Sequence, residues 1–253
     1  MNLDQYLNLA LEAATLASKA IMQTRDSVEI WKKEDKSLVS TADMVSNDII
    51  TQKLSQTNFK IFSEEKILKY EERKNLEYFW LIDPLDGTSG FLKNSDEFCV
   101  MISLIKEQRP ILALIQSPST NTVFYAHLHT PVYKNNTILK KDEDLINQNK
   151  NTALLSVNHL SKEDEDFAKK YNLKALNIGS GLKFCAILEG RAGVYKRNES
   201  LSIWDIAAGD FLINQMGGFM GDLNLKLLNY NQESYKALPF IALSDKKFLK
   251  DFL

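Results

Sequence analysis

Residues 80–88 have the sequence WLIDPLDGT, in which an apolar run passes directly into two carboxylates, Asp83 and Asp86. Pro84 stiffens the backbone between the two acids, and Gly87 permits a tight turn and a close approach by a ligand. Hard divalent cations such as Mg²⁺ bind oxygen ligands and usually take one or two carboxylates together with phosphate oxygens. The segment therefore predicts a strand that ends in a metal and phosphate site.

An ordinary turn is the alternative interpretation, because Asp-Gly is a common turn pair and Asp83 can act as a cap. Two other acidic segments favour the site. Residues 63–65 (SEE) follow the apolar pair Ile61-Phe62, which again places acids, here Glu64 and Glu65, at the end of a short predicted strand. Asp205 stands at the predicted start of a helix over residues 206–216, where its carboxylate and the helix N-terminus face the same space.

The N-terminal part of the chain predicts two helices followed by hairpins. Residues 3–24 place apolar side chains at helical spacing without Gly or Pro, and a second helix begins near residues 41–43. Short runs rich in Val, Ile, Phe and Tyr then follow at 79–82, 98–105, 111–116 and 122–126. Their close spacing favours antiparallel hairpins, because parallel strands need longer crossovers.

A polar segment over residues 134–151 separates two regions of different pattern, and we interpret it as a surface excursion or linker. Beyond it, predicted strands and helices alternate, which is typical of an α/β lobe. We therefore expect two lobes. Residues 1–150 would form an α+β lobe with a mainly antiparallel sheet, and residues 151–253 an α/β lobe.

Composition excludes several classes of protein. The 253 residues include 31 Lys and Arg against 33 Asp and Glu, for a formal net charge of -2, and 44% are hydrophobic. These values argue against bulk disorder and against the basic surface of a nucleic-acid-binding protein. The longest apolar runs are far shorter than the roughly 20 residues of a membrane-spanning helix. We expect a cytoplasmic protein that binds no nucleic acid polymer and spans no membrane. Peripheral association with a membrane stays open, as does the choice between a monomer and a homodimer.

With these motifs identified, the sequence resembles the family of magnesium-dependent, lithium-sensitive phosphatases that includes inositol monophosphatase, fructose-1,6-bisphosphatase and the 3'(2'),5'-bisphosphate nucleotidases. The resemblance covers nearly the whole chain and implies a layered αβαβα fold. Its four motifs are residues 40–43 (STAD), 63–65 (SEE), 80–88 (WLIDPLDGT) and 204–209 (WDIAAG). The similarity to the bacterial bisphosphate nucleotidases rests on Ser63, residues 178–185 (IGSGLKFC) and residues 195–197 (YKR).

The resemblance implies a site with two or three Mg²⁺ ions between the lobes. Two neighbouring metal ions can hold a phosphate, activate water and neutralise the leaving oxygen of an in-line displacement. Asp43 and Thr88 would orient and deprotonate the attacking water. The implied metal ligands are Glu64, Asp83, the Leu85 carbonyl, Asp86 and Asp205. The implied substrate contacts near them are Glu64, Leu85, Asp86, Gly87, Thr88 and Asp205.

A second phosphate would need cations, and the resemblance assigns it to Ser180, Lys183 and Arg197. Ser180 lies at the start of a predicted helix, a position that favours an anion, and Lys183 follows one turn later. The alternative is a helix cap and two solvated surface charges. By resemblance, His159 is a weak candidate for the adenine pocket, and a structural histidine is the equal alternative.

The implied activity is that of a Mg²⁺-dependent phosphomonoesterase that is inhibited by lithium. It would remove the 3'-phosphate from 3'-phosphoadenosine 5'-phosphate, giving AMP and phosphate, and so clear a by-product of sulfate activation in sulfur metabolism. An inositol or sugar phosphate monophosphatase on the same scaffold is the alternative, because pocket residues and not the fold set the substrate. A non-catalytic binding or regulatory module is less consistent with the joint presence of the acids and Thr88.

Overall fold

The structure, a computed structural model, begins with two packed helices, α1 (Leu3–Thr24) and α2 (Thr41–Leu54). An antiparallel strand pair, β1 (Ile30–Lys32) and β2 (Leu38–Ser40), lies between the helices in the chain, and the sequence pattern did not predict it. Small buried side chains line the packed face of α1 and allow close approach: Ala10, Ala13, Ala14 and Ala17. The described residues are 1–32, 38–156, 161–198 and 201–252.

A seven-stranded sheet follows the helices. Its strands are β3 (Lys60–Ser63), β4 (Tyr78–Asp86), β5 (Cys99–Lys106), β6 (Arg109–Ser117), β7 (Thr122–His127), β8 (Tyr133–Lys134) and β9 (Thr137–Ile138), in that spatial order. β3 and β4 are parallel, whereas all other neighbours in this sheet are antiparallel, which confirms the predicted hairpins. Two short helices, α3 (Tyr70–Arg73) and α4 (Thr88–Leu92), flank β4 in the chain.

A five-stranded sheet forms in the second half of the chain. Its order is β11 (Lys174–Asn177), β10 (Thr152–Leu155), β12 (Val194–Arg197), β14 (Phe240–Leu243) and β13 (Phe219–Asp222). β10 is parallel to both of its neighbours, and β14 is antiparallel to both of its own. The helical elements of this half are α6 (Lys162–Lys170), α7 (Leu182–Leu188), η1 (Ile203–Asp205), α8 (Ala207–Gln215) and η2 (Lys246–Asp251).

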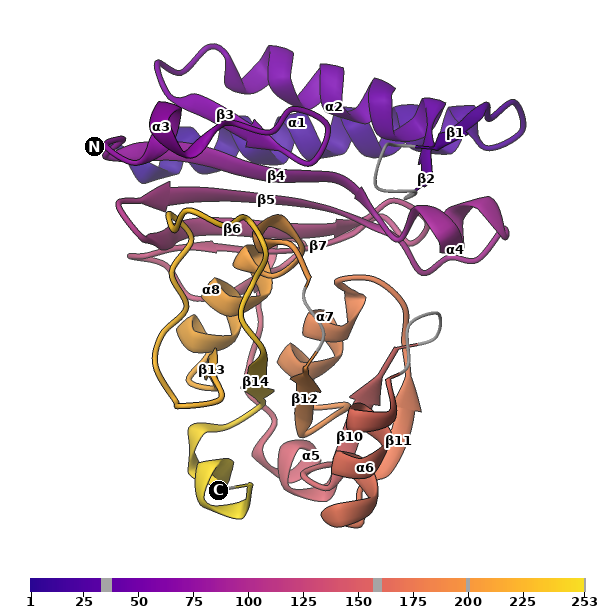
Figure 1. Cartoon of the computed structure of the whole chain (residues 1–253), viewed down its shortest axis with the longest axis vertical. Coiled ribbons are helices and arrows are strands. Elements are labelled where there is room, and N and C mark those ends of the chain that lie inside the picture. Colours follow the sequence, from indigo (N-terminus) through magenta and orange to yellow (C-terminus); the bar gives the residue numbers. More distant parts are fainter. Residues whose placement is uncertain (33–37, 157–160, 199–200, 253) are drawn as a thin grey trace.

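Helices and sheets alternate in layers (Figure 1), which confirms the predicted α/β architecture. α1 and α2 cover one face of the seven-stranded sheet, and α7 and α8 lie between its other face and the five-stranded sheet. α6 and η2 pack on the outer face of the smaller sheet. Within the residues that the structure describes, no helix combines the length and apolar character that a membrane crossing requires.

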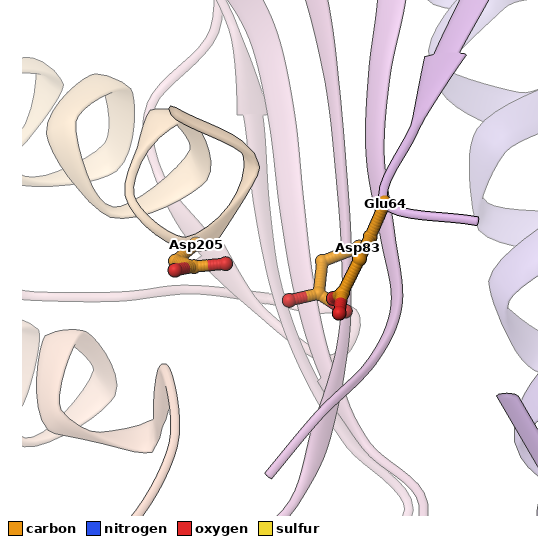
Figure 2. Close-up of side chains that lie close together, drawn as sticks. All are labelled: Glu64, Asp83 and Asp205. Atoms are coloured by element: carbon orange, nitrogen blue, oxygen red, sulfur yellow. The ribbon is translucent and has the colours of Figure 1, made fainter. Parts of the chain in front are cut away.

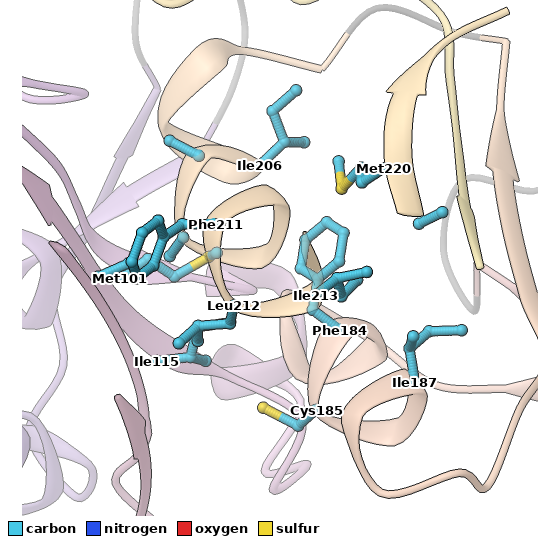
Figure 3. Packing of buried hydrophobic residues seen from close by; sticks show 14 of the residues in the cluster. Met101, Ile115, Phe184, Cys185, Ile187, Ile206, Phe211, Leu212, Ile213 and Met220 are labelled. Atoms are coloured by element: carbon cyan, nitrogen blue, oxygen red, sulfur yellow. The ribbon is translucent and has the colours of Figure 1, made fainter. Parts of the chain in front are cut away.

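The central helical layer joins the two sheets through a large hydrophobic cluster (Figure 3). Phe211 and Leu212 of α8 lie toward Met101 and Ile115 of the seven-stranded sheet. A Cβ at Gly209 would lie only 2.2 Å from the ring of Phe184 in α7, so glycine is required where the two helices meet. α8 thus packs against both the seven-stranded sheet and α7. These contacts also restrict the position of η1, the turn that directly precedes α8.

The polar segment over residues 134–151 is more ordered than predicted. It contributes to β8, contains β9 and forms a further helix, α5 (Glu143–Gln148). The Asp142 side chain accepts a hydrogen bond from the Leu145 N–H at 2.9 Å and caps α5, and Ile146 is buried. The segment therefore contains more regular structure than its polar composition predicts, and most of its side chains are exposed, as expected of a surface excursion. The division into two lobes near residue 150 stays a prediction.

Candidate metal and phosphate site

Three carboxylates from separate elements meet at one end of the seven-stranded sheet. Glu64 directly follows β3, Asp83 lies in β4, and Asp205 is the last residue of η1. One oxygen atom from each of the three side chains lies within 4.8 Å of the other two. Figure 2 shows Glu64 and Asp83 side by side, with Asp205 approaching from the opposite side. The structure thus brings together three of the predicted ligands.

The parallel pairing of β3 and β4 explains why Glu64 and Asp83 are neighbours. Ser63 pairs with Ile82 in the register of the two strands, so Glu64 and Asp83, the next residue of each chain segment, lie side by side where β3 ends. The Glu64 N–H donates to the Ile82 carbonyl at 3.2 Å. Ser63 fixes this turn further, because its hydroxyl donates to Asn47 Oδ1 at 2.7 Å. The pairing of β4 with β5 becomes irregular between Asp83 and Asp86, where the strand leaves its ladder.

Asp205 is held by the turn that contains it. Its Oδ2 accepts a hydrogen bond from the Ser202 N–H at 2.8 Å and closes a capping box over η1. The helix predicted over residues 206–216 is α8, which begins at Ala207, so Asp205 lies in a separate 3₁₀ turn just before it. The capping box thereby fixes the carboxylate that joins the cluster with Glu64 and Asp83.

The charges of this cluster oppose one another. Burial and then repulsion from Glu64 raise the pKa of Asp83 well above its ordinary value. Burial and then repulsion from Asp86 do the same for the pKa of Asp205. A divalent cation between these oxygens would remove the repulsion, and its preference for hard oxygen donors fits all three side chains.

Asp86 lies close to this cluster but is engaged elsewhere. Its Oδ2 accepts a hydrogen bond from the Gly181 N–H and lies 3.9 Å from the Cys99 sulfur. Burial raises the pKa of Asp86 to about 6, although the Lys183 ammonium opposes the shift. Asp86 therefore stands outside the three-carboxylate cluster, and it links that cluster electrostatically to Lys183.

Asp43 and Thr88, the predicted catalytic pair, are in direct contact. Thr88 Oγ1 donates to Asp43 Oδ1 at 2.8 Å, while Asp43 Oδ2 accepts hydrogen bonds from the Ser40 N–H at 2.7 Å and the Ser40 hydroxyl at 2.6 Å. Burial raises the pKa of Asp43, although the hydrogen bonds from Ser40 and Thr88 oppose the shift. Thr88 Oγ1 also lies 3.2 Å from the carbonyl oxygen of Leu85, which borders the same site.

Gly87 allows two distant parts of the chain to approach each other. Its φ is 95°, in the left-handed region, and it precedes α4 as the N-cap. A Cβ at this position would lie 2.7 Å from the Glu97 carbonyl oxygen and 3.0 Å from Ser180 Cβ. Ser180 therefore packs directly against the turn that carries Asp86 and Thr88.

Lys183 and Arg197 are both buried, with 6% and 4% of their surfaces exposed. Lys183 Nζ donates to the Ser180 carbonyl at 3.1 Å, and an Arg197 guanidinium nitrogen donates to Asp164 Oδ2 at 3.1 Å. Burial lowers the pKa of Lys183, and the Asp86 carboxylate opposes that shift. The alternative in which both cations are solvated surface charges is therefore wrong.

The expected helix start at Ser180 differs in the structure. α7 begins at Leu182, and Ser180 has a φ of 53° in the left-handed region. The Gly181 N–H is already paired with Asp86 across the site. The Gly181 N–H is thus not available to an anion in this structure, and the role expected of Ser180 in binding a phosphate stays a prediction.

The sequence did not predict Asp164 and Glu97 as neighbours of the site. Asp164 lies in the first turn of α6, and nothing in its local pattern indicates a partner 33 residues away. The Glu97 side chain covers Gly179, where a Cβ would lie 2.9 Å from Glu97 Oε2. His159, the weak candidate for the adenine pocket, lies outside the described residues.

The layered fold and the carboxylates that meet at the edge of its large sheet are those of a metal-dependent phosphatase. The chain belongs to the inositol monophosphatase family, since the sequence profile described as "Inositol monophosphatase family" matches residues 2–249. The family resemblance seen in the sequence motifs is thus confirmed.

Two curated relatives share a name. The 3'(2'),5'-bisphosphate nucleotidase CysQ of Salmonella typhimurium is 31% identical over 236 residues, covering 90% of this chain and 96% of the relative. The protein of the same name from Escherichia coli K12 is 32% identical over 240 residues, with coverages of 92% and 96%. The crystal structure of CysQ from Bacteroides thetaiotaomicron, a bacterial member of the inositol monophosphatase family, has a TM-score of 0.82 and 26% identity, covering 94% of this chain and 97% of that one.

Proposed function

We propose that this chain is a Mg²⁺-dependent phosphomonoesterase that hydrolyses the 3'-phosphate of 3'-phosphoadenosine 5'-phosphate to AMP and phosphate. The carrying observation is that Lys183 and Arg197 are both buried, and that Lys183 interacts electrostatically with Arg197 and with Asp86, which in turn interacts with Glu64 of the carboxylate cluster. A substrate with two phosphates needs metal ions for one and protein cations for the other. The bisphosphate nucleotidase name of the relatives supports the same substrate.

Five groups would hold two or three Mg²⁺ ions, and three of these five groups belong to the carboxylate cluster. These groups are Glu64, Asp83, Asp205, Asp86 and the Leu85 carbonyl. Bound Mg²⁺ supplies positive charge that binds the reacting phosphate, activates water and stabilises the leaving oxygen. Lithium inhibition, a cytoplasmic location and the choice between monomer and homodimer stay predictions.

The protein's own part in the reaction is to orient a water molecule and remove its proton. Because the Thr88 hydroxyl donates its hydrogen to Asp43, Oγ1 keeps lone pairs that can accept a hydrogen bond from water. The proton can then pass through Thr88 Oγ1 to the Asp43 carboxylate. The raised pKa of Asp43 favours this transfer, because a carboxylate that is harder to ionise is a better proton acceptor.

The proposed substrate is tested by initial rates in saturating Mg²⁺. We expect faster hydrolysis of 3'-phosphoadenosine 5'-phosphate than of inositol 1-phosphate, and no hydrolysis of either once the metal is removed with EDTA. Faster hydrolysis of the inositol ester would instead favour an inositol phosphate monophosphatase, the alternative that family membership keeps open. Phosphate release that persists without metal would contradict the metal assignment.

The Lys183→Met variant tests the second phosphate contact. Loss of a charge-assisted hydrogen bond should raise KM for the bisphosphate roughly 10- to 100-fold, while hydrolysis of inositol 1-phosphate changes little. Methionine keeps the length of the buried side chain and removes its charge. Lys174→Met, the same change at an exposed residue of β11, is the control. An unchanged KM for the bisphosphate would assign Lys183 a purely structural role.

A further inference from the structure

The segment from Leu228 to Ala237, here called the strap, connects β13 to β14 and contacts both halves of the site. Its first end is fixed to the seven-stranded sheet. An Arg109 guanidinium nitrogen donates to the Leu228 carbonyl at 2.5 Å, and the Tyr230 N–H donates to the Gln108 carbonyl at 2.9 Å. Strap and large sheet are thus joined through main-chain groups as well as side chains.

The same end of the strap is fixed to α8. Asp210, a fully buried residue of α8, accepts two hydrogen bonds from Arg109, at 2.7 and 2.9 Å. The Tyr230 hydroxyl donates to the same carboxylate at 2.7 Å. A single carboxylate therefore joins the large sheet, the strap and the helix that follows Asp205.

Arg73 of α3 fixes the middle of the strap. It is 1% exposed, and its guanidinium donates to Asn231 Oδ1 and to the Glu233 carbonyl, both at 3.1 Å. Asn231 returns a hydrogen bond to the Arg73 carbonyl at 3.2 Å. The guanidinium also lies 4.9 Å from the ring centre of Phe62, in the strand that leads to Glu64. Arg73 therefore connects the Glu64 strand to the strap.

The last part of the strap holds the turn that carries Asp205. The Ile203 N–H donates to the Tyr235 carbonyl at 2.9 Å, and the Ala237 N–H donates to the Leu201 carbonyl at 2.7 Å. The Tyr235 ring stacks on Trp204 with ring centres 5.3 Å apart. Trp204 in turn packs edge-on against Phe62, with ring centres 5.6 Å apart.

We propose that the strap sets the position of Asp205 relative to Glu64 and Asp83, and that Arg73 is the positioning residue. One oxygen of each carboxylate lies within 4.8 Å of the other two, although Asp205 comes from a turn in the other half of the chain. Without a fixed strap, this turn would relax away from the other two acids. The inference rests on the proposed Mg²⁺ site and assigns a role to residues that contact neither metal nor substrate.

Calorimetric titration of the full chain with Mg²⁺, without substrate, measures this role directly. Arg73→Lys keeps a cation over Phe62 but cannot bridge Asn231 and Glu233, so Mg²⁺ should bind about tenfold more weakly, as is usual for residues that support metal ligands. Asn231→Ala breaks the same contact from the strap side. The double variant should have the same Mg²⁺ affinity as the single variant that binds Mg²⁺ less tightly, because both changes remove the same interaction.

Phe248→Ala is the matched control for lost stability, since Phe248 packs in the separate cluster around η2. It should lower the melting temperature but leave Mg²⁺ affinity unchanged. Unchanged Mg²⁺ affinity in Arg73→Lys and Asn231→Ala, or equal weakening in Phe248→Ala, would overturn the role of the strap. Failure of the unmodified chain to bind Mg²⁺ would overturn the metal site itself, and the two failures are thereby distinguished.

Discussion

Asp83→Asn is expected to lower kcat/KM for the bisphosphate nucleotide by about a thousandfold, the size of losing several kcal/mol of metal-dependent stabilisation. Asp83 is 1% exposed and lies in the carboxylate cluster, and its Oδ1 accepts the Leu85 N–H at 3.1 Å. Asparagine keeps the shape of the side chain and can keep that hydrogen bond. The expected loss of kcat/KM therefore results from the missing negative charge. A phosphate-release assay measures this loss.

Thermal unfolding separates this effect from damage to the fold. Because burial and repulsion raise the pKa of Asp83, its ionised form destabilises the metal-free fold, so Asp83→Asn should melt no lower than the parent without Mg²⁺. Added Mg²⁺ should raise the melting temperature of the parent much more than that of the variant. Asp144→Asn, at an exposed residue of α5, should change neither activity nor melting. Equal phosphate release by parent and Asp83→Asn would exclude Asp83 as a metal ligand.

Thr88→Val should reduce kcat by roughly 100- to 10,000-fold, the range for loss of a positioned proton acceptor or donor. Valine nearly matches the volume of threonine but cannot donate to Asp43 or accept a hydrogen bond from water. Thr88→Ser keeps the hydroxyl and should retain most of the activity. The decisive measurement is kcat for all three proteins at saturating substrate and Mg²⁺.

Mg²⁺ affinity provides the second readout for Thr88. The variants should bind Mg²⁺ as the parent does, because the Thr88 side chain is assigned to the water and not to the metal. Equal losses of activity in the serine and valine variants would contradict the assigned role, because the serine variant keeps the hydroxyl that the valine variant lacks. Weakened Mg²⁺ binding would show that Thr88 supports the nearby Leu85 carbonyl instead.

Much of the fold could be predicted because its signals are local. The apolar run before Asp83 predicts β4, and the helical spacing of residues 3–24 predicts α1. The contact between Ser40 and Asp43 is a capping box, whose two members are three residues apart. These elements are formed by residues close together in the chain, so the local sequence pattern is enough to predict them. The polar composition of residues 134–151 correctly predicts an exposed segment, but it does not predict α5, which Asp142 caps.

The choice of chemistry was also accessible from the sequence, since oxygen ligands, a Pro-stiffened turn and phosphate-binding motifs are properties of residue types. Three features of the site could not be predicted from the sequence. These are that Glu64, Asp83 and Asp205 lie within 4.8 Å of one another, that Lys183 and Arg197 are buried, and that Arg73 holds the strap. Each depends on contacts between elements distant in the chain, and only the packing of the two sheets around α7 and α8 brings those elements together.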